Sequence, residues 1–393
     1  MKQQISLLIA LLLSTIAELN AATILWTNTA GGNWNAAANW SPNSVPGLSD
    51  TAVITNAGTY SVAVNAAVTI AGLQLGGASG AQTLANASQT LTLNGPGNVS
   101  ANGVLTQTGG TTTGSGSLSV AGSLNWSGGT MGLTGGIANS GTATISGGGV
   151  KVLTGQFANA GQLIWTLGQW NLNTGSELTN LATGTFDIQA GLNLANPGGT
   201  AKVGNAGLVK KSAGAGAAVI DRTFINTGTV DVQSGILDIS GGGTNSGAIT
   251  VPSGGTLRFS ATYTLAAGSS VTGAGQVAFT GGTIGVDGTY NITGTNAFIG
   301  ATVNFIGSYT LDGLHFHLQS GTVFLPNALT VPQLTISGGT LNSSNTITVS
   351  GLLNFAPGTI SGAGDIFANG GVNVTGGSVK TLNGHRLINA ATL

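Results

Sequence analysis

The sequence predicts an all-β protein, specifically a single-stranded parallel β-helix (β-solenoid) with about 19–21 residues per coil. Three observations support this prediction. A glycine-rich phrase returns at nearly constant spacing, apolar and polar residues alternate between its copies, and a second phrase built on asparagine recurs with a similar period. Sequence periods of this size are typical of stacked structural units that each contact only their neighbours.

The glycine-rich phrase is clearest in the C-terminal part of the chain. Its copies are Gly281-Gly282-Thr283, Gly300-Ala301-Thr302, Ser320-Gly321-Thr322, Gly338-Gly339-Thr340, Pro357-Gly358-Thr359 and Gly376-Gly377-Ser378. Their middle residues are separated by 19, 20, 18, 19 and 19 residues, and an earlier run at Gly110, Gly129 and Gly148 is separated by 19 and 19. We interpret both runs as one corner of the coil.

The residues around each middle glycine predict which side chains face the core. The position three residues before it is apolar at Trp126, Ile145, Phe279, Phe298, Leu318, Ile336, Phe355 and Val374, and the position two residues after it is apolar at Met131, Val150, Ile284, Val303, Val323, Leu341, Ile360 and Val379. The position four residues before it holds mostly polar residues, such as Asn125, His317 and Asn354. Because side chains alternate along a strand, the apolar positions should face inward and the polar position outward.

The asparagine phrase runs through the middle of the chain, at Asn139, Asn159, Asn180, Asn205, Asn226 and Asn245. Asn and Gly accept left-handed backbone angles, so this column is expected to mark a second corner. Stacked Asn side chains would also add hydrogen bonds along the axis.

Composition restricts the class of protein. Lys and Arg number 9 and Asp and Glu 10 in 393 residues, which leaves no basic surface for nucleic acid. The absence of cysteine excludes disulfides and thiolate metal sites. Residues 1–22, with Lys2, an apolar run and a small-residue stretch at Ala21-Ala22, are typical of a secretory signal peptide. No transmembrane helix is expected in the mature chain.

The segment 23–58 differs from the rest and is expected to form a Trp-rich N-terminal cap, followed by the repeat domain at 59–393, which ends mid-repeat. The cap segment contains Trp26, Gly31-Gly32-Asn33-Trp34, Asn39-Trp40, Pro46 and Asp50. This pattern resembles the opening of exported bacterial β-helix repeat proteins related to autotransporter passengers and filamentous adhesins. The three indole rings should cover an open strand edge; the alternative is an aromatic platform for sugar rings.

Two other sets of residues are candidates for chemistry. His315 and His317 share one face of a predicted strand near Asp312, which would suit a metal ion, although the column that contains His317 is simply outward and polar.

The carboxylates are sparse, and the densest group, Asp221, Asp231 and Asp238, lies in different phases of successive coils. Polysaccharide cleavage needs clustered carboxylates, so we predict that the protein is not an enzyme and has no cofactor. A threonine column from Thr283 to Thr359 lacks the second outward threonine that an ice-binding face would need.

The expectation is therefore an exported, surface-associated structural or adhesin-like solenoid, with a polysaccharide-binding or polysaccharide-degrading protein as the alternative. The resemblance implies a secreted or outer-membrane-associated location in a Gram-negative-type bacterium. Candidate partners are host or environmental glycans and neighbouring surface proteins. The aromatic-ended barrel strands of autotransporters are missing from the sequence, so a C-terminal anchor or barrel beyond residue 393 is a further expectation.

Overall fold

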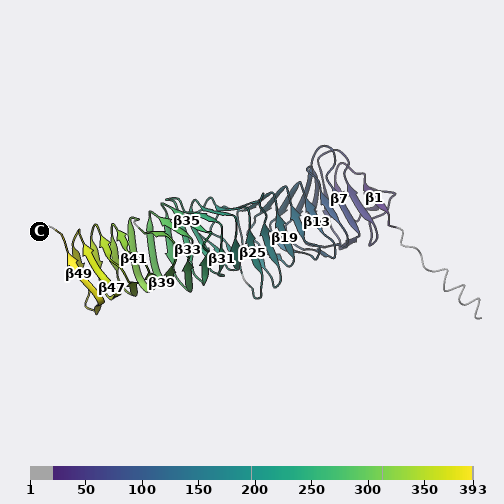
Figure 1. Ribbon diagram of the computed structural model, residues 1–393. Coiled ribbons are helices and arrows are strands. Elements are labelled where there is room, and N and C mark those ends of the chain that lie inside the picture. The colour runs from purple at the N-terminus through teal and green to yellow at the C-terminus, as the bar shows by residue number, and fades with distance from the viewer. Residues whose placement is uncertain (1–20, 196, 312, 392–393) are drawn as a thin grey trace, which may run out of the picture.

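In the computed structural model, which describes residues 21–195, 197–311 and 313–391, the chain forms a parallel β-solenoid of about 17 turns. The predicted fold class is confirmed. The turns stack into a long rod, with β1 and β49 at opposite ends (Figure 1). At ~4.8 Å per turn, the rod is on the order of 80 Å long.

Each turn contributes strands to three faces, which we number in the order the chain visits them. Face 1 contains β1 Thr23–Trp26, β4 Thr51–Ile54, β7 Gly72–Leu75, β10 Gly97–Val99, β13 Leu118–Val120, β16 Ile137–Asn139, β19 Gln156–Asn159, β22 Glu177–Asn180, β25 Lys202–Asn205, β28 Thr223–Asn226, β31 Gly243–Asn245, β34 Tyr263–Leu265, β37 Thr283–Val286 and β44 Thr340–Ser343. Neighbouring strands of this face pair in parallel along the whole rod.

Face 2 follows face 1 in the chain. It contains β2 Gly32–Asn33, β5 Tyr60–Val64, β8 Gln82–Asn86, β11 Gly103–Gln107, β14 Ser123–Trp126, β17 Thr142–Ile145, β20 Gln162–Trp165, β23 Thr185–Ile188, β26 Leu208–Lys211, β29 Thr229–Val232, β32 Ala248–Thr250, β35 Ser270–Gly273, β38 Thr289–Ile292 and β40 Tyr309–Thr310. In the last turns β42 Leu329–Val331 and β45 Ile347–Val349 occupy the corresponding place.

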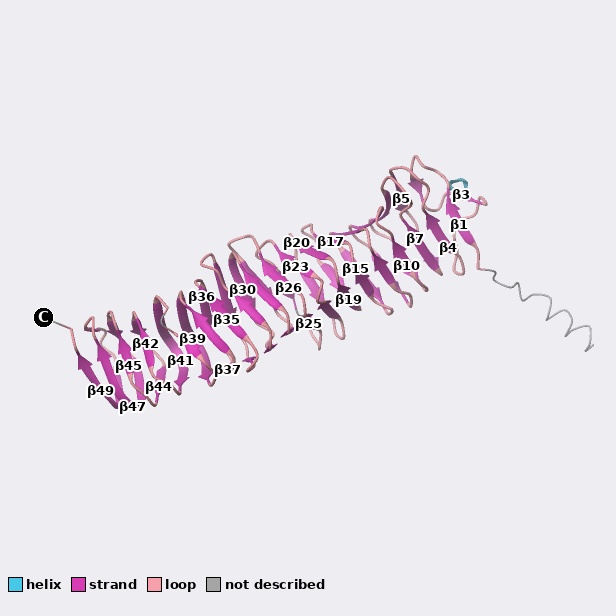
Figure 2. Cartoon of the chain, turned by 45° about the horizontal axis from the view of Figure 1, so that its top comes forward, coloured by secondary structure: helices cyan, strands magenta, loops and turns pink. Residues whose placement is uncertain are grey.

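Face 3 closes each turn. It contains β6 Val68–Ile70, β9 Thr90–Leu93, β12 Thr111–Gly114, β15 Gly129–Leu133, β18 Lys151–Leu153, β21 Trp170–Leu172, β24 Asn193–Ala195, β27 Ala217–Ile220, β30 Gly235–Ile239, β33 Gly255–Phe259, β36 Gln276–Phe279, β43 Leu334–Ile336, β46 Leu353–Phe355 and β48 Val372–Val374. Figure 2 shows the strands of successive turns lying side by side.

Four long strands pass over a corner without a break. β39 Thr295–Phe305 and β41 His315–Leu325 belong to faces 3 and 1, whereas β47 Gly358–Ala368 and β49 Lys380–Asn389 belong to faces 1 and 2. At the N-terminal end, the short 3-10 helix η1 Ala37–Asn39 leads into β3 Trp40–Ser41, which pairs antiparallel with β1. Strand β1 also pairs in parallel with β4.

The predicted inward columns form the core, with three exceptions. Trp126, Ile336 and Met131 are among the fully buried members. Val150, Val374 and Val379 are exposed, contrary to the prediction. The corner after β17 is longer than its neighbours, so Leu153 rather than Val150 pairs with Met131. Val374 and Val379 belong to the last described turn, and within the described residues β48 pairs only with β46.

The glycine phrase marks corners, but the two runs do not mark the same one. Gly110 and Gly129 lie between faces 2 and 3, whereas Gly282, Gly321 and Gly339 lie between faces 3 and 1. The last three have φ values of 72°, 83° and 72°, a region that favours glycine. The same short sequence pattern of a strand followed by a glycine corner therefore occurs at different corners of the coil. Our prediction that both runs mark one corner is wrong.

The asparagine column lies at the corner between faces 1 and 2, but our explanation for it is wrong. Among non-glycine residues of the described chain only Asn43 has a positive φ, so these asparagines are not left-handed. Each ends a strand of face 1 with its side chain buried in the core. Each amide except that of Asn245 donates to the Oδ1 atom of the next asparagine, at 2.7 Å for Asn139 to Asn159, 2.8 Å for Asn159 to Asn180 and 2.8 Å for Asn180 to Asn205. The predicted axial hydrogen bonds are present.

Candidate functional site

The three N-terminal tryptophans form a buried aromatic cluster. Their exposed fractions are 0% for Trp26, 1% for Trp34 and 1% for Trp40. The Trp40 ring meets Trp26 edge to face at 5.0 Å and Trp34 at 4.8 Å between centroids. The Trp26 indole N–H donates to the Asn28 carbonyl and the Trp40 indole N–H to the Trp34 carbonyl.

This burial decides between the two interpretations of the tryptophans. A sugar platform needs an aromatic face open to solvent, whereas these rings pack against one another and the first strands. The structure contradicts the proposal that Trp26, Trp34 and Trp40 form a ligand surface. The rings lie at the end of the rod beside the antiparallel pair of β1 and β3, where they fill the first turn.

His315 and His317 lie on the outward side of β41, as the sequence predicts, with their rings stacked at 5.1 Å. Their Nε2 atoms lie 2.9 Å from Thr335 Oγ1 and 3.3 Å from Ser337 Oγ in the next turn. Burial lowers the pKa of both imidazoles below the ordinary value, and for His315 the neighbouring His317 adds to this effect. Asp312, the third member of the predicted metal trio, lies outside the described residues.

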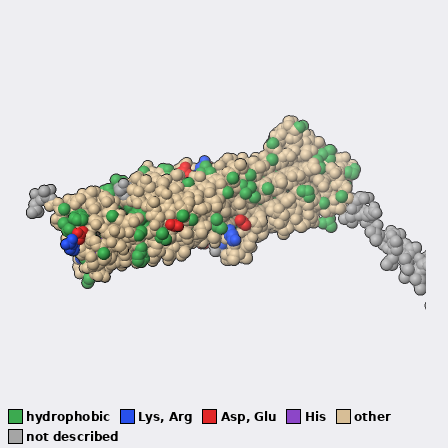
Figure 3. Space-filling model, viewed as in Figure 1, with side chains coloured by type: hydrophobic (Ala, Val, Ile, Leu, Met, Phe, Trp, Pro, Cys, Tyr) green, Lys and Arg blue, Asp and Glu red, His purple; other side chains and the backbone are tan. Residues whose placement is uncertain are grey.

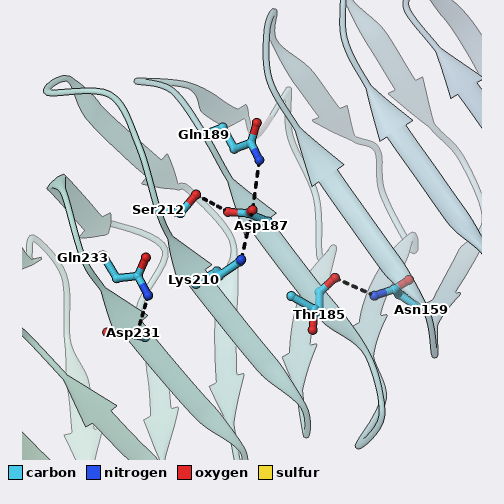
Figure 4. A network of polar contacts seen from close by, with 8 residues as sticks. All are labelled: Asn159, Thr185, Asp187, Gln189, Lys210, Ser212, Asp231 and Gln233. Atoms are coloured by element: carbon cyan, nitrogen blue, oxygen red, sulfur yellow. Dashed lines mark hydrogen bonds and ion pairs between the residues drawn. The ribbon is translucent and has the colours of Figure 1, made fainter.

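Two separate groups of polar contacts, one around Asp187 and one around Asp231, lie on neighbouring turns of face 2 (Figure 4). The Asp187 carboxylate is 3.2 Å from the Lys210 ammonium and accepts hydrogen bonds from Gln189 and Ser212. One turn beyond Lys210, Asp231 accepts hydrogen bonds from Gln233 at 2.7 Å and from Thr250 at 2.9 Å. Both carboxylates are therefore occupied by side chains that hold adjacent turns together.

The other candidate carboxylates, Asp221 and Asp238, are also separated from these groups. Asp238 lies on face 3, where Arg258 donates at 2.6 Å and Ser260 at 2.6 Å. Asp231 lies on face 2 and Asp221 follows β27 of face 3, so the densest acidic group of the sequence does not converge. Within residues 21–195, 197–311 and 313–391, no group of three or more His, Cys, Asp or Glu could hold a metal ion.

Three buried cations in the irregular middle of the chain were not predicted from the sequence. Lys151 is fully buried, and its ammonium donates to the carbonyls of Ser146, Gly147 and Leu167 at 2.8, 2.8 and 2.9 Å. Burial lowers its pKa to about 8. Lys211 and Arg222 are likewise buried and donate to backbone carbonyls. The alternation of Lys151 with the inward Leu153 is the signal that could have revealed Lys151.

A polar groove on face 1, which we call the face 1 groove, was also missed. It has a volume of about 450 Å³ and is lined by residues of β7, β10 and β13 and the corners that follow face 1: Thr55, Gln74, Gly76, Asn98, Val99, Ser100, Ser119, Ala121 and Ser140. The exposed side chains of Gln74, Asn98 and Ser119 make no hydrogen bond within the described chain. The sequence contains no charged residue or histidine from position 51 to position 150, which includes the entire groove.

The fold defines the class of the protein as an all-β parallel solenoid, with a buried aromatic cluster at one end. No protein-family model, no curated protein and no solved structure matches the chain. The resemblance to autotransporter passengers and filamentous adhesins stays a prediction. Across the described residues, no helix has the length and apolar character needed to cross a membrane.

Proposed function

We propose that this protein is an exported, non-catalytic solenoid that serves a structural or adhesin-like role at a bacterial surface. The observation that carries the proposal is that the carboxylates are bonded to side chains of neighbouring turns. Asp187, Asp231 and Asp238 each accept hydrogen bonds from neighbouring turns, and two of them are also ion-paired. These groups stabilise the stacking of turns, which is what a rod that presents a long surface needs.

The composition of the N-terminal residues supports export, and the lack of cysteine suits a fold that is stabilised by burial and stacking alone. Residues 1–20 of the proposed signal peptide lie outside the described residues. We place the mature protein in the secreted or outer-membrane-associated fraction of a Gram-negative-type bacterium. Its proposed partners are glycans or neighbouring surface proteins, and a C-terminal anchor beyond residue 393 is part of the same proposal.

Export is tested by N-terminal sequencing of the protein recovered from outside the cell. Cleavage after Ala21 or Ala22 gives a chain that starts at Ala22 or Thr23. An intact chain that begins at Met1 and is found only inside the cell would refute export. The non-catalytic role is tested by incubating the purified protein with polysaccharides: release of oligosaccharides that is lost on substitution of Asp187 or Asp238 would overturn it.

The second candidate function is polysaccharide binding, which the face 1 groove favours. Its lining offers amides and hydroxyls that are not occupied within the described chain, in a part of the protein that has no charge. A glycan array with the purified chain tests this function independently of where the protein resides.

A further inference from the structure

We propose that the face 1 groove binds an uncharged polysaccharide chain, laid across successive turns through the amides of Gln74 and Asn98 and the hydroxyl of Ser119. This inference rests on the second proposed function and assigns it a site and a ligand class.

The groove is produced by a change in the length of one corner. Between face 1 and face 2, the chain runs through residues 55–59 and 76–81 in two early turns, but only through 100–102, 121–122 and 140–141 in the next three. The long corners project beside β5, as Figure 2 shows. The groove is lined both by residues of the long corners, Thr55 and Gly76, and by residues of the short corners, Ser100, Ala121 and Ser140. The hollow is a consequence of how the turns are built.

The floor of the groove presents a regular row of hydrogen-bonding groups. Gln74 pairs with Asn98, and Asn98 with Ser119, as neighbours in three consecutive parallel strands. Their side chains consequently stand in one outward column, spaced by ~4.8 Å along the axis. All three are exposed and make no hydrogen bond to the described chain. Amides and hydroxyls both donate and accept, as do the hydroxyl groups of a sugar.

The chemistry of the surroundings excludes other classes of ligand. Phosphate and anionic glycans need cations, and neither the groove nor the sequence from position 51 to position 150 has one. Figure 3 shows that the visible face carries no Lys, Arg, Asp or Glu side chain over the N-terminal third of the rod. An extended peptide would need a free strand edge, but β10 is paired on both sides, with β7 and β13. A neutral polyhydroxylated chain is the ligand that remains.

The test uses the full chain and affinity electrophoresis in gels that contain dextran, yeast mannan or galactan, with polygalacturonate as the charged comparison. The wild type should be retarded by at least one neutral polymer, and the retardation should be the same at low and high salt because no ion pair is involved. Gln74→Ala combined with Asn98→Ala should weaken binding about 10-fold, because the hydrogen bonds of two amides to the polymer are lost.

The matched control is Asn125→Ala, an exposed asparagine on face 2 within the same uncharged part of the chain. This variant should bind like the wild type. If the wild type binds a neutral polymer and the double variant binds equally well, the groove is not the site, although polysaccharide binding stands. If the wild type is retarded by none of the neutral polymers, or only by polygalacturonate, the assignment of ligand class is overturned, whereas a structural role at the surface is untouched.

Discussion

Removing one asparagine from the middle of the buried ladder should destabilise the rod far more than removing an exposed one. Asn205 accepts from the Asn180 amide at 2.8 Å and donates to Asn226 Oδ1 at 2.6 Å and to the Thr229 carbonyl at 3.0 Å. Asn205→Ala therefore removes these three hydrogen bonds, together with a longer one of 3.3 Å to the Gly207 carbonyl, and leaves buried polar atoms without a partner. A loss of ~1 kcal/mol per bond, with an added penalty for each orphaned group, gives a destabilisation of about 3–5 kcal/mol.

The isosteric variant Asn205→Asp keeps the shape of the side chain but replaces the donating amide with a carboxylate. A carboxylate can still accept from Asn180, but it places a charged oxygen against Asn226 Oδ1, where an N–H group donates in the wild type. At neutral pH this variant should be at least as unstable as Asn205→Ala. Because burial and the facing oxygen disfavour the charged form, the pKa of the new carboxyl should be raised. Its stability relative to the wild type should then recover as the pH falls through that pKa.

The assay is urea denaturation followed by circular dichroism, with hydrogen exchange to locate the unfolding turns. Solenoids can unfold in parts, so the hydrogen exchange of residues near 205 is the more direct readout. Asn98→Ala, on the surface of face 1, is the control and should change the midpoint little. A change of less than about 0.5 kcal/mol for Asn205→Ala, within the range of ordinary surface substitutions, would refute the role assigned to the ladder.

Three further predictions follow from core packing, from a corner and from buried charge. Ile336→Asp puts a charge without a partner into a fully buried position and should abolish cooperative folding of the C-terminal turns; an unchanged melting temperature would contradict the assigned facing. Gly282→Ala forces a side chain into a left-handed corner and places its Cβ 2.3 Å from the backbone nitrogen of Thr262, so it should destabilise by more than the ~1–2 kcal/mol of the left-handed angle alone, measured by the same denaturation assay. Burial lowers the pKa of Lys151 from 10.5 to about 8, so the unfolded chain binds more protons between these values and stability should rise with pH from 8 to 9.5. In thermal melts, the stability of Lys151→Met should rise less with pH than that of the wild type. The same dependence of stability on pH in both proteins would argue against a lowered pKa of Lys151.

The fold was predictable because period and alternation are both properties of the sequence. Ile336 and Phe355 occur at the same offset from a glycine and both face the core. The same offsets gave no information about which of the three faces a strand occupies. Gly129 and Gly282 have similar neighbours, yet they turn the chain at different corners. The face on which a residue lies depends on how many strands and corners precede it in the chain. Small differences in corner length do not change the repeat pattern enough to be recognised in the sequence.

The candidate sites were harder to predict, because burial depends on what lies in adjacent turns. The sequence allowed the three tryptophans to form either an exposed surface for sugar rings or a buried cap on the first turn. Only their packing against one another distinguishes these alternatives. Lys151 follows a run of glycines, and its cage of carbonyls comes from two different corners. The face 1 groove depends on corners that are separated by whole turns. Its lack of charge, in contrast, could be read directly from residues 51–150.

The most direct test of the central claim is antibody binding to intact cells of the source organism. Antibodies raised against the purified chain should label intact cells as strongly as permeabilised ones, and protease added outside should remove the signal. Labelling that requires permeabilisation and survives external protease, with none of the protein in the medium, would contradict a surface or secreted rod.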